Sequence, residues 1–175
     1  MTERLGTLSK LQYLYLWKCS LTSLPNLSGL VQLRSLYLRE NRLSKLDGLS
    51  NVSYLHISDN LFTDIPKLKN PNNLRVLGAN HIPLKNMLAI ISHTNLFSLT
   101  LRNTTLSSIP DTINNLQKLT ELDLFDNKLS YLPTNILNLP VLKTLYIGKN
   151  LFTSDDVLAI KGQFNALHPN GTIYV

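Results

Sequence analysis

A chain of 175 residues, 43% of them apolar, is long enough to bury one continuous core, and we expect a single domain over 1–175. No apolar run reaches the roughly 18 residues that cross a bilayer, which excludes a transmembrane helix, and the single Cys19 excludes an internal disulfide. The whole net charge of +6 lies in residues 1–88, with 11 basic and 5 acidic side chains, whereas 89–175 carries six of each. This asymmetry indicates either a localised basic patch or a solvated basic face.

One pattern fills the chain from residue 11 onward in seven copies, which start at 11, 33, 52, 74, 96, 119 and 142. A clear copy is Leu33-Arg-Ser-Leu36-Tyr-Leu38-Arg-Glu-Asn41-Arg-Leu43, and others start at Val52, Leu119 and Leu142. Its L-x-L centre alternates with a period of two, which predicts a short strand with leucines inward and the residue between them outward. The asparagine is expected to bond turn amides and carbonyls inside the stack.

These copies resemble the leucine-rich repeat family, whose pattern is LxxLxLxxNxL, and the resemblance covers almost the whole chain. It implies an α/β solenoid shaped as a curved right-handed arc, with a parallel sheet on the concave face and short helices or 3₁₀ turns on the convex face. The stretches Ser107–Leu116 and Ser130–Leu139 carry the Leu/Ile-Pro signature of the bacterial 22- to 23-residue type. A short helical turn is expected after each of these prolines.

Taken in chain order, the ends and departures of the array carry further predictions. Residues 1–10 have no signal-peptide core, so the compartment stays open, and Leu5 and Leu8 match the tail of a preceding repeat. The first strand is therefore expected to present an unprotected edge, which a partner subunit covers or through which the chain self-associates. Cys19 stands at the asparagine position of the first copy, where a buried structural cysteine is expected, and Thr104 is a similar small replacement.

Three later segments have their own signals. Ile82 replaces the asparagine of the copy that starts at Leu74, so the backbone of that turn needs other partners. Apolar residues at 84, 87, 88 and 91 predict the buried face of a true helix over 84–91. Residues 154–175 read as a capping helix that begins at a Ser154 cap, followed by a turn and a final strand that closes the stack.

Residues that flank the inward leucines should point out of the concave face, and those of the first three copies are rich in aromatics. This candidate partner-binding set is Tyr13, Tyr15, Trp17, Tyr37, Arg39, Tyr54 and His56. Rigid exposed aromatics and arginine have the composition of binding hot spots, whereas the structural alternative is that the rings only cover the sheet. Because adjacent strands lie ~4.8 Å apart, Tyr15, Tyr37 and His56 should form one row. The later copies offer a less aromatic surface, with Thr100, Arg102, Asp123, Phe125 and Tyr146.

Signatures of catalysis, of a phosphate-binding loop and of metal ligation are lacking in the sequence, so we expect a binding protein with no cofactor and no metal. The favoured function is protein–protein interaction through the concave face, and the resemblance to bacterial repeat proteins implies a host factor as one partner class. The alternative is binding of nucleic acid or an anionic glycan through the basic N-terminal half, near Lys18, Arg34 and Arg39. A third possibility is a targeting fragment of an effector enzyme.

Overall fold

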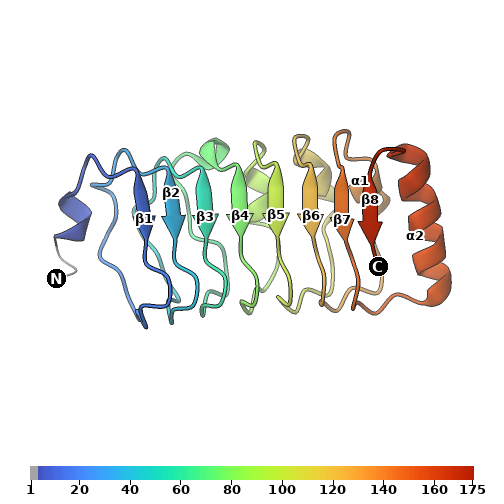
Figure 1. Cartoon of the computed structure of the whole chain (residues 1–175), viewed down its shortest axis with the longest axis horizontal. Helices are drawn as coiled ribbons and strands as arrows, with labels where there is room; N and C mark the ends of the chain where they lie inside the picture. The colour runs from blue at the N-terminus through green and yellow to red at the C-terminus, as the bar shows by residue number, and fades with distance from the viewer. Residues whose placement is uncertain (1–3) are drawn as a thin grey trace.

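The computed structural model describes residues 4–175, in which eight short strands form one parallel sheet in sequential order, β1 to β8 (Figure 1). The strands are β1 (Tyr13–Tyr15), β2 (Ser35–Tyr37), β3 (Tyr54–His56), β4 (Val76–Gly78), β5 (Ser98–Thr100), β6 (Glu121–Asp123), β7 (Thr144–Tyr146) and β8 (Thr172–Tyr174). The helical segments are the 3₁₀ helices η1 (Leu5–Thr7), η2 (Pro71–Asn73), η3 (Ile90–Ser92) and η4 (Asp111–Asn115), and the α-helices α1 (Thr134–Leu137) and α2 (Ser154–Leu167). The predicted solenoid of α/β class is confirmed.

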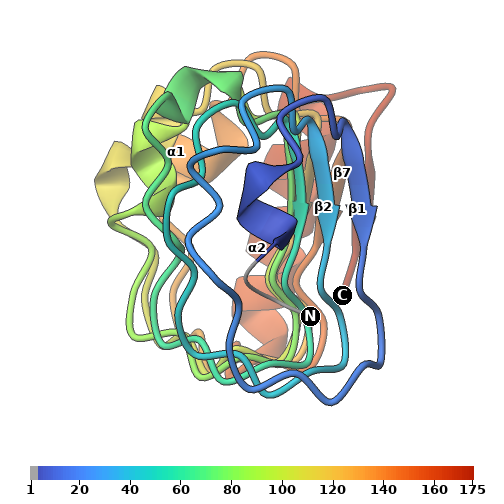
Figure 2. The same cartoon turned by 90° about the vertical axis from the view of Figure 1, so that its left-hand side faces the viewer.

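The core lies between the sheet on one side and the short helices on the other, as Figure 2 shows along the length of the stack. The central leucine of each strand from β2 to β7 is fully buried. The register pairs these leucines across neighbouring strands, for example Leu36 with Leu55 and Leu55 with Leu77. Each such burial contributes roughly 1.5–3 kcal/mol, so the repeated leucine is the main source of cohesion between repeats.

The asparagine of one repeat bonds the backbone of the repeat before it. The Oδ1 atom of Asn127 accepts hydrogen bonds from Thr104 N and Leu106 N at 3.0 and 3.1 Å, and its Nδ2 donates to Leu101 O and Leu124 O. Asn41, Asn60 and Asn150 make equivalent bonds. The Thr104 hydroxyl donates to Leu101 O at 3.1 Å. These bonds satisfy buried turn groups, as the repeat pattern predicts.

Each repeat turns away from the sheet through a residue with positive φ that is not glycine. These residues are Lys18, Glu40, Asp59, His81, Asn103, Asp126 and Lys149, with φ between 49° and 59°. A left-handed conformation costs an ordinary residue roughly 1–2 kcal/mol, and the packed leucines on both sides of the turn outweigh that cost. The same turn of repeat four, which lacks the asparagine, uses other donors and acceptors: Ser58 Oγ accepts from Asn80 N, and Asn80 Oδ1 accepts from Arg102 N.

The prediction of a helix over 84–91 is wrong. The segment is extended and then turns, and its only helical part is the end of it, in η3. Leu84, Met87 and Ile90 are buried, whereas Leu88 is 62% exposed. Burial thus recurs every three residues, which suits 3₁₀ geometry and leaves the residue at the fourth position in solvent. Short helical turns do follow Pro110 and Pro133, as η4 and α1, and these two predictions are confirmed.

The two ends of the stack differ from each other. At the C-terminal end α2 covers the core with Ile160 and Phe164. Its N-cap is Thr153 rather than the predicted Ser154, because the Thr153 side chain accepts from Asp156 N while Asp156 bonds back to Thr153 N.

At the other end, η1 lies across the opening of the stack (Figure 2), so the expectation of a bare N-terminal end is wrong in part. The part of that expectation that concerns residues 1–3 lies outside the described residues. Leu5 packs against the core, and Gly6 approaches the backbone so closely that a Cβ there would lie 2.6 Å from Asn26 O. Leu11, Leu14, Leu16 and Leu21 are nevertheless only partly buried.

Candidate functional site

An aromatic row crosses the exposed face of β1, β2 and β3. The parallel register aligns Tyr15 with Tyr37 and Tyr37 with His56. The ring centroids of each neighbouring pair lie 4.6 Å apart, with planes 9° from parallel. The predicted row is confirmed, and its rings are stacked face to face at the spacing of the strands.

Other aromatic side chains flank this row and stay in contact with solvent. Tyr13 and Tyr54 lie in the neighbouring row on either side of the buried Ser35, and they are 57% and 37% exposed. Tyr15 is 64% exposed, and Trp17, just beyond the end of β1, is 60% exposed. We call the seven predicted residues together the aromatic patch: Tyr13, Tyr15, Trp17, Tyr37, Arg39, Tyr54 and His56. The structure brings them together on one surface.

Charged side chains border the aromatic patch on one side. Arg39 Nε lies 3.0 Å from Asp59 Oδ2, and His81 Nδ1 lies 2.7 Å from Asp59 Oδ1. Sequence reasoning singled out neither Asp59 nor the contact with His81, because Asp59 occupies the left-handed turn position and its reach across the repeats depends on that backbone conformation. Asp59 thus holds Arg39 in place beside the rings.

Burial affects the ionisation of the row. It lowers the pKa of His56, and the ring is therefore neutral at pH 7. It also raises the pKa of Tyr37, to which charge on Tyr15 and Tyr54 adds. The row is consequently an uncharged aromatic surface with hydroxyl and imidazole groups that can form hydrogen bonds.

The row ends at a small hollow over Gly78, which follows His56 in the register. A Cβ at Gly78 would lie 2.6 Å from His56 Nδ1, so only glycine leaves room for this position of the imidazole. The hollow has a volume of about 160 Å³, and His56, Arg39, Asp59 and Thr100 are among its lining residues. It can take one polar side chain of a partner, with a cation, a carboxylate and a hydroxyl within its walls.

The second half of the sheet carries a different surface. Asp123 is buried and pairs with Arg102, whose guanidinium lies 5.2 Å from the ring centroids of both Phe125 and Tyr146. Tyr146 stacks on Tyr174 at 4.4 Å, a pair that sequence reasoning missed because the last strand has no complete repeat around it. This half thus has one aromatic pair and one buried ion pair in place of the longer row.

Cys19 is exposed, so the prediction of a buried cysteine is wrong. Its N–H donates to Asn41 Oδ1 at 3.1 Å and its Sγ donates to Trp17 O at 3.2 Å, as expected for the asparagine position. Burial at this position requires a repeat on the N-terminal side, and among the described residues none covers the first turn.

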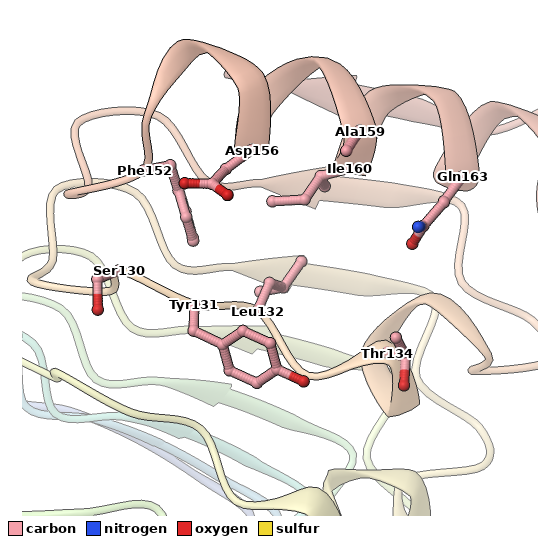
Figure 3. Close-up of a pocket in the computed structure, with 9 residues that line it drawn as sticks. All are labelled: Ser130, Tyr131, Leu132, Thr134, Phe152, Asp156, Ala159, Ile160 and Gln163. Atoms are coloured by element: carbon pink, nitrogen blue, oxygen red, sulfur yellow. The ribbon is translucent and has the colours of Figure 1, made fainter.

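A shallow cavity of about 170 Å³ lies on the opposite side of the molecule, between α2 and residues 130–134 (Figure 3). Its walls include Leu132, Phe152 and Ile160, and its single carboxylate, Asp156, is occupied in the cap of α2. This cavity is a seam of the C-terminal cap. Within residues 4–175 there is no group of three or more side chains placed to hold a metal ion, and no helix there is long and apolar enough to cross a membrane.

Comparisons with known proteins agree with this architecture. Family models described as leucine-rich repeats match residues 9–51, as two copies, and 118–139. Lumican of Mus musculus is 33% identical over 168 residues, which cover 90% of this chain and 48% of lumican. The chain therefore spans about half the length of the curated relatives it matches.

Solved structures show the same fold. An internalin of Listeria monocytogenes aligns with a TM-score of 0.79 and 24% identity, over 99% of this chain and 49% of that one. A leucine-rich repeat protein of Leptospira interrogans aligns with a TM-score of 0.60 and 21% identity, over 100% of this chain and 57% of that one. The repeat pattern, the stacked strands, the buried asparagines and these matches lead to one conclusion: the chain belongs to the leucine-rich repeat family.

Proposed function

We propose that this protein binds another protein through the exposed face of its first three repeats, with the aromatic patch as the anchoring surface. Leucine-rich repeat proteins as a class are binding scaffolds rather than enzymes. The observation that carries the proposal is the stacked row of Tyr15, Tyr37 and His56, next to the exposed rings of Tyr13 and Trp17. Large rings that are already ordered bury much area on binding and lose little entropy.

Mutual packing alone does not account for these rings. Tyr15 contacts Tyr37 on one side, yet 64% of its surface stays in solvent, and Trp17 is 60% exposed. Contiguous apolar surface of this kind is uncommon on a soluble protein and marks interaction sites. The stacking therefore orders the surface without covering it, which is the condition of a preformed anchor.

The hollow over Gly78 adds a polar contact at the end of the row. A partner that lays an apolar segment along the rings would bring its next side chain to His56, Thr100 and the Arg39–Asp59 pair. The bacterial repeat type seen in the sequence makes a host protein the first partner class to test. Self-association through the outer edge of β1 is a second form of partnership, which sedimentation at several protein concentrations would test.

Affinity capture with matched variants tests the main proposal. The test variant combines Tyr15→Ala, Trp17→Ala and Tyr37→Ala, and the control combines Tyr131→Ala, Leu151→Ala and Leu158→Ala, which remove similarly exposed apolar groups elsewhere. A partner captured from host lysate by the wild type should then be purified and its Kd measured by calorimetry. We expect the test variant to bind at least about tenfold more weakly and the control to bind as the wild type does. Equal binding by both variants would refute the role of the aromatic patch.

A further inference from the structure

A second surface lies where the chain leads into strands β2, β3 and β4. A cavity of about 470 Å³ opens there, and its walls are mostly polar side chains that include Arg34, Ser53 and Arg75. None of its lining residues is acidic, and none belongs to the aromatic patch. It is thus a separate, positively charged hollow on the rim of the stack, along the side from which the chain approaches the strands (Figure 1).

Backbone hydrogen bonds bring the two arginines to either side of a small residue. Ser53 N donates to Arg34 O at 2.8 Å, and Arg75 N donates to Ser53 O at 2.8 Å. The three residues therefore occupy equivalent positions in three successive repeats, and the two arginine backbones are roughly 10 Å apart. Within residues 4–175, neither guanidinium makes an ion pair with a carboxylate, so both are available to an external anion.

Asparagine side chains form the floor of the hollow, and bonds between repeats hold them in place. Asn51 Nδ2 donates to Val31 O at 2.9 Å, and Asn51 Oδ1 accepts from Asn73 Nδ2 at 3.2 Å. Asn95 Nδ2 donates to Asn72 O at 2.7 Å. These amides are ordered before any ligand arrives, and each retains further donor or acceptor capacity, which lowers the cost of binding a polar molecule.

The charge of the surroundings keeps one sign over several repeats. The sequence has no aspartate or glutamate between Asp64 and Asp111. Beyond the hollow, Lys118 Nζ lies 2.6 Å from Asn95 Oδ1 and continues the basic rim. The first carboxylate met on this side of the sheet is that of Glu121, in β6, which accepts a bond from Ser98 Oγ. The rim from Arg34 to Lys118 therefore attracts an extended anion.

We propose that this rim binds a sulfated polysaccharide chain, with Arg34 and Arg75 as its main anion contacts. A planar guanidinium pairs with sulfate or carboxylate oxygens through two hydrogen bonds. The asparagines and Ser53 offer the neutral donors and acceptors that sugar hydroxyls require. Single-stranded nucleic acid is bound largely by stacking of its bases on aromatic rings, and the hollow has no aromatic side chain in its lining. The chemistry therefore favours the glycan.

Calorimetric titration with a heparin octasaccharide tests the inference. The test variant is Arg34→Ala with Arg75→Ala, and the control is Lys67→Ala with Lys85→Ala, which removes the same charge from exposed residues outside the hollow. We expect the test variant to bind at least about tenfold more weakly, since charge-assisted hydrogen bonds are lost, and the control to change less than twofold. Desulfated heparin should bind far more weakly than heparin.

Three results would overturn the inference: no binding of heparin by the wild type, equal weakening in the test and control variants, or single-stranded DNA of equal charge that binds as tightly through Arg34 and Arg75. Both arginines are exposed, so the variants should fold, and the conservative pair Arg34→Gln with Arg75→Gln provides a second version. The variant of Tyr15, Trp17 and Tyr37 should bind heparin normally, which separates this site from the proposed protein-binding surface.

Discussion

Replacing Asn127 by alanine tests whether the buried asparagines hold adjacent repeats together. In the wild type Asn127 Oδ1 accepts from the N–H groups of Thr104 and Leu106 in the preceding repeat. The carbonyls that its Nδ2 contacts keep other donors, since Leu101 O also accepts from the Thr104 hydroxyl and Leu124 O from Asn150 Nδ2. The substitution therefore leaves two buried N–H groups without a partner.

An unsatisfied buried amide costs about 1–3 kcal/mol, so Asn127→Ala should lower the free energy of unfolding by about 2–5 kcal/mol. Water that enters the vacated space would bring the loss toward the lower end of that range. Urea denaturation with linear extrapolation measures it, provided that the m value stays constant. The control is Asn114→Ala, an exposed position where a change below about 0.5 kcal/mol is expected. A loss below about 1 kcal/mol for Asn127→Ala would refute the argument.

Two further predictions concern ionisable groups. Arg102→Ala leaves the buried carboxylate of Asp123 with Phe125 N–H as its remaining donor, so the free energy of unfolding should fall by about 1–3 kcal/mol. Arg102→Lys, which keeps the charge, should lose less in the same urea assay, and equal losses would contradict an electrostatic cause. Burial lowers the pKa of His56 and His93 below the ordinary 6.5, so the unfolded chain takes up protons first as the pH falls. Stability should be constant above that pH, decline as pH falls through 6.5 and level off below the folded-state pKa values, and His93→Gln should reduce the decline; a flat wild-type profile from pH 7.5 to 5 would count against it.

The sequence predicts the sheet well because its information is periodic. Once Leu36 and Leu55 are recognised as the same position in two repeats, the pairing of Tyr37 with His56 follows without any further assumption. The stacking of those rings follows in turn from the strand spacing. Periodicity therefore specifies the aromatic row, although the role of that row in binding stays a proposal.

Other features depend on information that a single repeat does not contain. Cys19 is exposed because of its place at the first turn of the array, and the pattern within its own copy is the same as that of a buried position. The helix over 84–91 was wrong because apolar residues three and four apart are compatible with both an α-helix and a series of 3₁₀ turns, and only the packing of the convex side decides between them. Sequence reasoning did not single out Arg75, because its approach to Arg34 becomes visible only when repeats of unequal length are aligned by their hydrogen bonds.

The unequal ends of the core have a consequence for local unfolding. Leu14, Leu16 and Leu21 of the first repeat are only partly buried, whereas Phe164 and Ile160 of the C-terminal cap lie against a fully packed repeat. In a linear array, the repeat with fewer buried contacts opens more often and its amides exchange hydrogen faster. The aromatic patch begins on that repeat, so a ligand that needs Tyr15 and Trp17 in place would also suppress this opening. Its binding energy would then be measured partly as order conferred on the first turn of the solenoid.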